Sequence, residues 1–217
     1  MLHDPLLDRT TDGAGPVSGQ PLAAVQRLDA GFGFTAADGS HPHRGKGIRV
    51  PTLRELLAAH ADVPLNIEIK QGDPPIVDRV LADLDAFGAR ERTLLAAEHH
   101  DITKAIRAAA PDMLTSASAI EAADFVFRVR DGRLDDYRPA AVALQVPPEY
   151  EGTPIVTAES VAVAHRFGLE VHVWTINDAP EMERLLDLGV DALMSDFPDR
   201  VAAVLRRRGF RSAGLGH

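Results

Sequence analysis

Apolar runs of strand length alternate with helical patterns along most of this chain of 217 residues, and this alternation constrains its fold more than any other feature. The predicted strands cover residues 65–70, 93–97, 113–116, 141–146, 170–176 and 191–195. The predicted helices cover residues 52–60, 75–87, 102–109, 119–129, 158–167, 180–188 and 198–208. A regular alternation of this kind produces a mainly parallel sheet with helices outside it. The sequence therefore predicts an α/β fold.

The order of these elements favours a TIM-like (β/α) barrel over a doubly wound sheet. Six strands have intervening helices, and no glycine-rich dinucleotide motif follows the first strand. In such barrels the chemistry lies at the C-terminal ends of the strands. The residues that fall at these ends are Glu68, Lys70, Trp174 and Asp196.

Several helix boundaries carry local signals. Residues that suit N-caps precede four of the helices: Thr52, which forms a capping box with Glu55, then Asp101, Asn177 or Asp178, and Asp196. Gly88, Gly168 and Gly189 stand where helices are expected to end. Segments 8–19 and 31–49 lack periodicity and are predicted to be irregular loops.

The segment 65–70 is the most informative candidate for chemistry. Side chains alternate faces along a strand, so Asn66, Glu68 and Lys70 share one face, and Ile67 and Ile69 the other. A carboxylate beside an ammonium suits a site that holds a cation next to an anion. A structural ion pair on a half-exposed sheet has the same pattern, so both interpretations stay open.

Other candidates are open to a functional and a structural interpretation. His3 is a possible general acid or base, or a solvated terminal side chain. Trp174, expected to share a face with His172 and Ile176, forms either part of the core or the apolar wall of a cleft. Segments 41–47 and 98–101 gather histidines, but a solvated loop and an N-cap at Asp101 are the favoured interpretations.

Charge and composition narrow the possible partners. The formal net charge is −9, and no long basic stripe is visible, which argues against nucleic acid and anionic membrane surfaces. The chain has no cysteine, so disulfides, thiolate metal sites and a cysteine nucleophile are excluded. No run approaches the ~18 apolar residues of a membrane span, and we expect a cytoplasmic protein.

Six segments, taken in order, resemble the glycerophosphodiester phosphodiesterase family. The segment from His3-Asp4-Pro5 to Gly13 is similar to the family's second-histidine motif. The other similar segments are 28–31 (LDAG), 50–53 (VPTL), 66–70 (NIEIK), 173–177 (VWTIN) and 189–196 (GVDALMSD). The resemblance extends from residue 2 to about residue 205, in the family's order and at plausible spacings.

The resemblance implies a TIM-like barrel enzyme that hydrolyses glycerophosphodiesters to sn-glycerol 3-phosphate and an alcohol. It also implies a divalent cation, Mg²⁺ or Ca²⁺, and a pair of catalytic histidines. His3 matches the second of these histidines, and Lys70 matches the lysine beside metal and phosphate. Glu68 matches a metal-binding carboxylate, and Trp174 matches an aromatic residue of the cleft wall.

The chain departs from the family pattern before His3. The family begins with a strand that ends in His-Arg-Gly, followed by Pro-Glu-Asn-Thr and then Glu-x-Asp, and none of these precedes His3. The run His43-Arg44-Gly45 lies downstream, so we do not assign it the first histidine's role. We expect residues 1–210 to form an incomplete barrel that lacks the first strand-helix unit and most of the second strand, with residues 211–217 as a flexible tail.

The favoured function is a metal-dependent phosphodiester hydrolase of glycerophospholipid metabolism, weakened by the missing motifs, that acts on a small-molecule glycerophosphodiester. Two alternatives stay open. One is a non-catalytic barrel that binds or dimerises, since an incomplete barrel exposes sheet edges and a homo-oligomer would cover them. The other is a phosphate-ester barrel hydrolase of the phosphoinositide phospholipase type.

Overall fold

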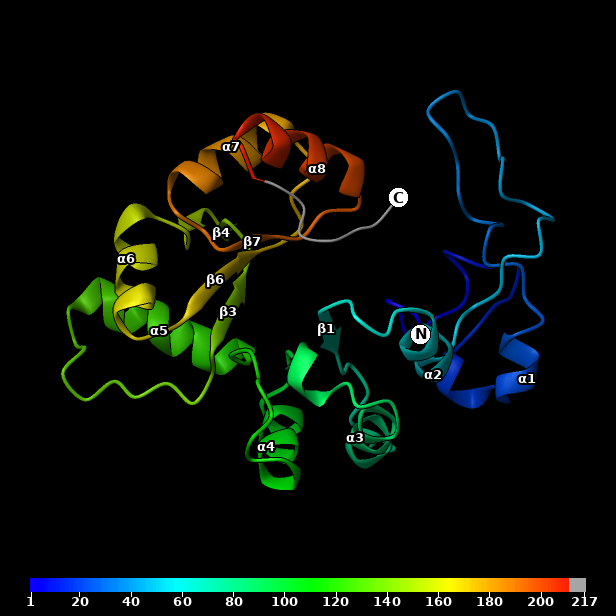
Figure 1. The fold of residues 1–217 in the computed structure, drawn as a ribbon, viewed down its shortest axis with the longest axis horizontal. Helices are drawn as coiled ribbons and strands as arrows, with labels where there is room; N and C mark the ends of the chain where they lie inside the picture. The colour runs from blue at the N-terminus through cyan, green and yellow to red at the C-terminus, as the bar shows by residue number, and fades with distance from the viewer. Residues whose placement is uncertain (211–217) are drawn as a thin grey trace. The chain divides into compact units, whose positions relative to one another are not determined.

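The computed structural model describes residues 1–210 and divides the chain into two compact units (Figure 1). Unit 1 comprises Met1–Val63 and Ala82–Ala89, and unit 2 comprises Pro64–Leu81 and the chain from Arg90 onward. The predicted flexible tail at residues 211–217 lies outside the described residues.

Unit 1 contains little regular structure. Its short elements are the 3-10 helix η1 (Val17–Gly19) and helices α1 (Leu22–Val25) and α2 (Leu53–Ala59). The capping box predicted at Thr52 and Glu55 is confirmed, with the Thr52 side chain accepting from the Glu55 N–H at 3.1 Å. Leu7, Val25 and Val50 form a small buried cluster.

The predicted irregular loop at residues 31–49 is confirmed as turns and bends. The loop packs closely where it contains glycine. A Cβ at Gly31 would lie 2.3 Å from the His43 carbonyl oxygen, and one at Gly33 would lie 2.1 Å from that of Arg9. Both positions therefore require glycine, because any side chain would collide with backbone.

The parallel strands predicted from the sequence appear in unit 2. They are β1 (Leu65–Glu68), β2 (Thr93–Ala96), β3 (Ala143–Val146), β6 (Glu170–Val173) and β7 (Ala192–Leu193). Parallel pairing joins β1 to β2, and β3 to β6 to β7. Bridges from Leu95 to Thr115 and from Ser116 to Ala143 join the two groups through the predicted strand 113–116. All six segments therefore belong to one parallel series in chain order.

A short antiparallel hairpin, β4 (Glu149–Tyr150) and β5 (Thr153–Pro154), was not predicted. Its two-residue turn places Glu151 and Gly152 at positive φ, 49° and 76°. This is the backbone that tight hairpin turns require. The glycine was the available signal, but two-residue strands carry no periodic pattern.

The predicted helices are confirmed, with ends shifted by at most two residues. They are α3 (Val77–Ala86), α4 (His100–Ala109), α5 (Ala119–Asp131), α6 (Ala158–Arg166), α7 (Ala179–Asp187) and α8 (Pro198–Arg207), and a 3-10 turn η2 (Arg90–Arg92) precedes β2. The helix ends predicted at Gly88, Gly168 and Gly189 are supported by positive φ angles at all three.

Two of the predicted N-caps are wrong. Helix α4 begins two residues earlier than expected, so His99 is the N-cap, and Asp101 lies in the first turn and pairs with Lys104. Helix α8 has Pro198 at its first position, which makes Phe197 the N-cap in place of Asp196. The Asp178 cap on α7 is confirmed, and its carboxylate accepts the Glu181 N–H at 3.2 Å.

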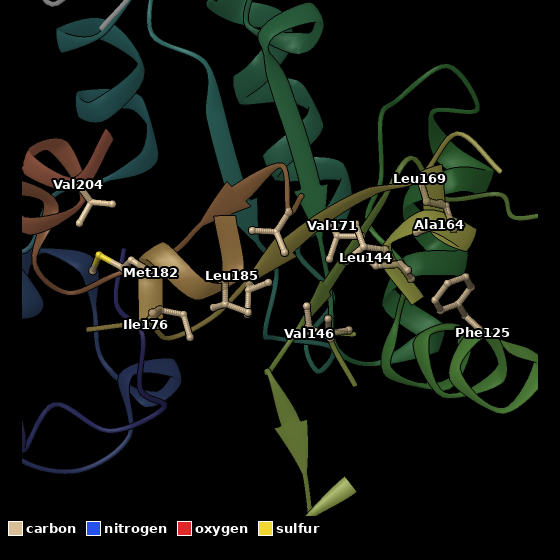
Figure 2. Packing of buried hydrophobic residues seen from close by; sticks show 14 of the residues in the cluster. Phe125, Leu144, Val146, Ala164, Leu169, Val171, Ile176, Met182, Leu185 and Val204 are labelled. Carbon is tan, nitrogen blue, oxygen red and sulfur yellow. The ribbon is translucent and has the colours of Figure 1, made fainter. Parts of the chain in front are cut away.

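The core of unit 2 lies between strands and helices. Strands β3 and β6 lie beside helices α5 and α6 (Figure 1). Figure 2 shows Leu144 and Val171, from neighbouring strands, within a cluster that also receives Phe125, Ala164 and Leu185 from the helices. Alternate residues of the same strands face away from this cluster, and the polar residues gather there.

Candidate active site

The polar face predicted on β1 is confirmed. Ile67 and Ile69 are buried, while Asn66, Glu68 and Lys70 are exposed, as the alternation of a strand requires. The Lys70 ammonium lies 3.0 Å from Glu68 Oε2, and the two side chains are 41% and 36% exposed. The carboxylate and the ammonium therefore meet at the C-terminal end of β1, accessible to solvent.

Strands β3 and β6, and Met194 directly after β7, contribute to the same face. Gln145 Nε2 lies 3.0 Å from Asn66 Oδ1 and 3.3 Å from His172 Nδ1. His172 Nε2 lies 2.9 Å from Glu170 Oε2, and Asn66 Nδ2 lies 3.9 Å from the Met194 sulfur. Sequence reasoning gave Gln145 no role, although its alternation with Leu144 and Val146 placed it on the face opposite the core.

Trp174 follows β6 and is 43% exposed, so it is not a core residue. The prediction that Ile176 shares its face is wrong, because Ile176 is buried in the hydrophobic cluster of unit 2. The alternation fails because β6 ends at Val173, three residues earlier than a strand to 176 would require. Trp174 is thus available to a ligand, and its role in a cleft wall stays a prediction.

Asp196, instead of capping α8, joins the two loops that follow β6 and β7. Asn177 donates to Asp196 Oδ2 at 2.9 Å, and Asn177 Oδ1 accepts from the Ser195 hydroxyl and the Asp196 N–H, each at 3.0 Å. Arg200 donates to the Asn177 carbonyl at 3.0 Å. These bonds fix the loops at the C-terminal end of this part of the sheet.

His3 belongs to unit 1, whereas Glu68, Lys70 and Trp174 belong to unit 2. The His3 side chain is 73% exposed, and its Nδ1 lies 2.7 Å from Asp4 Oδ1. Arg9 donates to the other Asp4 oxygen at 2.5 Å. The hydrogen bonds from Arg9, and then from His3, hold the pKa of the Asp4 carboxyl well below its usual range. The ionised Asp4 keeps a proton on His3 Nδ1, which places the lone pair of the neutral ring on Nε2.

Among the described residues, the histidines of segments 41–47 and 98–101 are not grouped as the ligands of a metal ion would be. His100 Nδ1 lies 2.9 Å from the Ser118 hydroxyl, and Arg44 Nε donates to the Phe32 carbonyl at 2.7 Å. Within residues 1–210, no group of three or more His, Asp or Glu side chains is placed to hold a metal ion. The described residues therefore supply single carboxylates, such as Glu68, but not a cation site.

No helix among the described residues is both long enough and apolar enough to cross a membrane.

Comparison with known proteins gives the family directly. The model of the glycerophosphoryl diester phosphodiesterase family matches residues 1–200. A glycerophosphodiester phosphodiesterase of Caldanaerobacter subterraneus is 26% identical over 218 residues, which cover 96% of this chain and 81% of the relative. One of Bacillus subtilis is 28% identical over 212 residues, 92% of this chain and 69% of the relative.

Solved structures support the fold. The glycerophosphoryl diester phosphodiesterase domain of a Mycobacterium tuberculosis protein aligns with a TM-score of 0.78 at 22% identity, over 95% of this chain and 82% of that one. An Oleispira antarctica phosphodiesterase, solved with its product sn-glycerol 3-phosphate, aligns with a TM-score of 0.67 at 24% identity, over 94% and 78%. The predicted TIM-like α/β fold is confirmed. The chain belongs to the glycerophosphoryl diester phosphodiesterase family, whose members are phosphoric diester hydrolases.

Proposed function

We propose that this chain hydrolyses glycerophosphodiesters to sn-glycerol 3-phosphate and an alcohol, as part of glycerophospholipid metabolism. The observation that carries the proposal is the Glu68–Lys70 pair, exposed at the C-terminal end of β1 with its atoms 3.0 Å apart. Barrel enzymes place their chemistry at this end of the strands. The family match over residues 1–200 supports the same reaction class.

Three residues act in the proposed hydrolysis. The Lys70 ammonium binds the phosphoryl oxygens and stabilises the negative charge that grows on them in the transition state. His3 moves a proton to or from the glycerol hydroxyl or the leaving oxygen. The Trp174 ring provides an apolar wall for the substrate. The chemistry of each side chain and its accessible position support these roles.

A divalent cation is the group that fits these residues least well. The family is generally dependent on such an ion. We propose Glu68 as one ligand, but Ca²⁺ takes about six to eight oxygen ligands, and Mg²⁺ needs an octahedral set at least partly made by protein. The single carboxylate is also engaged with Lys70. The described residues therefore do not complete a site, and we assign no step of the reaction to the ion.

The test is hydrolysis by the purified chain of a panel that contains glycerophosphocholine and glycerophosphoinositol, with Mg²⁺, Ca²⁺ or neither. We expect release of sn-glycerol 3-phosphate, and strong loss of it in His3→Asn. The control is Glu149→Gln, which removes an exposed carboxylate of the β4–β5 hairpin. A folded wild-type chain that hydrolyses no member of the panel would overturn the proposal. Hydrolysis of the inositol ester alone would favour the phosphoinositide phospholipase type.

A second candidate is a non-catalytic module that binds or dimerises, and the incomplete cation site favours it. Calorimetric titration with Mg²⁺ and Ca²⁺ separates the candidates when combined with a measurement of molar mass in solution. No heat of binding, together with a stable dimer and no hydrolysis, would support the module. Hydrolysis by a monomer would exclude it.

A further inference from the structure

A chain of four polar side chains crosses the polar face of unit 2 and has no role in the proposed reaction. It runs from Glu170 through His172 and Gln145 to Asn66, with successive distances of 2.9, 3.3 and 3.0 Å. These residues come from β6, β3 and β1. Strand β3 is hydrogen-bonded to β6, whereas β1 is hydrogen-bonded to β2, so the side chains connect strands that the backbone does not pair directly.

With the amide orientations that Gln145 and Asn66 have in the structure, the network has one consistent assignment of protons. The Gln145 amide nitrogen only donates, so the oxygen of Asn66 and Nδ1 of His172 must both accept from it. The remaining hydrogen of His172 is then on Nε2, which donates to the Glu170 carboxylate. The Asn66 amide nitrogen faces the Met194 sulfur, a weak acceptor, and this agrees with the same orientation of Asn66. In this arrangement His172 accepts at Nδ1 and donates from Nε2.

The network is partly buried and lies beside a cavity. His172 is only 9% exposed, whereas the side chain of its partner Glu170 is 66% exposed. A cavity of about 650 Å³ borders the network, and its lining includes Asn66, Glu170 and His172. The lining also includes Leu65 and Thr93, the first residues of β1 and β2, so the cavity opens at the amino ends of the strands. The network thus lies at the end of β1 opposite Lys70.

We propose that Gln145 and His172 are positioning residues that fix Asn66 and, through β1, hold Glu68 and Lys70 in place for the phosphodiester. This inference rests on the proposed function. Asn66 and Glu68 are two residues apart on one strand face, so a shift of β1 at Asn66 moves both. A displacement of about 1 Å at a reacting group costs up to about 100-fold in rate.

The first test does not depend on activity. In ¹⁵N NMR spectra of the wild-type chain near neutral pH, we expect His172 to carry its proton on Nε2, with Nδ1 unprotonated. In Gln145→Leu this preference should be lost, and the backbone amide signals of Glu68 and Lys70 should move. A His172 ring protonated on Nδ1 in the wild type would overturn the proposal. Unmoved Glu68 and Lys70 signals in the variant would do so too.

The second test measures kcat and KM for the best glycerophosphodiester of the panel. We expect Gln145→Leu and His172→Phe to lower kcat/KM by about 10- to 100-fold. The matched control is His165→Phe, which removes another histidine–carboxylate pair, His165 Nε2 to Asp191 Oδ2 at 2.8 Å, from an exposed position. Equal kcat/KM in all three variants would contradict the positioning role. A wild type without hydrolysis would refute the proposed function, while the NMR result would still decide the positioning.

Discussion

Lys70 is the residue whose charge the proposed reaction needs most. Replacement by methionine keeps most of the length of the side chain and removes the ammonium that lies 3.0 Å from Glu68. We expect Lys70→Met to lower kcat by about 10²- to 10³-fold, the usual cost of losing one group that stabilises transition-state charge. The urea midpoint should change little, because both members of the pair are partly exposed.

Lys104→Met is the matched control for that measurement. Lys104 pairs with Asp101 at 2.8 Å on the surface of α4, so its loss removes an ion pair of the same kind. We expect it to retain wild-type kcat. If Lys70→Met also keeps kcat within about twofold, the pair is a structural ion pair only.

Asp4 fixes which ring nitrogen of His3 carries the proton. Its ionised carboxylate accepts from His3 Nδ1 and from Arg9, which lowers the pKa of Asp4. We expect Asp4→Ala to lower kcat about tenfold or more, because His3 loses the partner that fixes its tautomer. The pH profile of kcat should change shape as well. Asp8→Asn is the control, since it keeps an acceptor for the Gly15 N–H in the same loop; an equal loss in both would indicate a general effect on the loop.

Alternation along one strand was enough to predict which face carries Asn66, Glu68 and Lys70, since each strand residue points opposite to its neighbour. The same rule failed at Ile176, because the strand ends at Val173. It also gave no reason to connect Gln145 with Asn66, which is 79 positions away. Such contacts depend on how strands are placed, and a single sequence does not specify that placement.

At the scale of elements, Arg107 joins α4 to α5. Its guanidinium contacts both Glu121 oxygens, at 2.5 and 3.2 Å, and donates to the Thr115 hydroxyl at 2.9 Å. Burial opposes ionisation of Glu121, but Arg107 and the Ser118 N–H outweigh it, so the pKa of Glu121 is lowered. We expect Arg107→Ala to cost about 2 kcal/mol in the free energy of unfolding, because it removes charged hydrogen bonds from a half-buried place.

Urea unfolding measures this loss, with Lys104→Ala as the exposed control at below about 0.5 kcal/mol. The contribution should also depend on pH. A lowered folded-state pKa stabilises the fold above the unfolded value of about 4.3, and the gain is lost as the pH falls below it. The lowered pKa of Glu121 would be contradicted by one result: that the free energy of unfolding falls in parallel for the wild type and Arg107→Ala between about pH 6 and pH 3.

Tyr137 packs between the middle of α5 and the C-terminal end of α6, and we expect its phenol to make stability depend on alkaline pH. Its ring contacts Phe125 and Phe167 at centroid distances of 5.8 and 5.1 Å, and burial, together with Asp124 and Glu121, raises its pKa to about 12. Between about pH 10 and 12 the unfolded chain loses the phenol proton first, so the free energy of unfolding falls by up to about 2 kcal/mol. Below pH 10 this effect is absent.

Tyr137→Phe keeps the ring and removes the proton, so we expect its stability to decline less between pH 10 and 12 than that of the wild type. Urea midpoints from circular dichroism at several pH values measure the difference. Tyr150→Phe is the control, because Tyr150 is 64% exposed and is the other tyrosine of the chain. Identical alkaline declines in the wild type and Tyr137→Phe would show that the phenol does not titrate as described.

Local patterns predicted elements better than their boundaries. The apolar periodicity found all seven helices of residues 52–208, because packing of an amphipathic face dominates helix formation. It did not decide between neighbouring cap candidates. The N-cap of α4 is His99 instead of Asp101. The N-cap of α8 is Phe197 instead of Asp196, because Pro198 occupies the first helical position. The choice depends on one or two backbone angles, which side-chain type alone does not set.

At the scale of the whole molecule, the ordered series of motifs predicted the family, since six separate segments had to agree in order. The division into two units was not apparent from the alternation. It depends on contacts between distant segments, such as the 2.8 Å ion pair from Arg54 to Asp83 and the stacking of Arg54 on Phe87 at 5.1 Å. These contacts attach part of α3 to unit 1 and interrupt the regular order of strands and helices.

The two units should differ in how readily they open. The cluster of Leu7, Val25 and Val50 in unit 1 is small, whereas the cluster around β3 and β6 contains fifteen buried residues. Buried apolar area sets the free energy of local opening, so residues 1–50 should open without the rest of the chain. Hydrogen exchange followed by mass spectrometry measures this directly.

We expect peptides from residues 1–50 to exchange at least about tenfold faster than peptides covering 143–146 and 170–173, since even ~1.4 kcal/mol separates openings by that factor. The comparison should use amides that are hydrogen-bonded in both units, such as Leu7 N to Gly15 O at 2.9 Å and Trp174 N to Val146 O at 3.2 Å. Equal rates under conditions where exchange follows stability would mean that the units unfold together. The small cluster would then draw its stability from contacts outside residues 1–50.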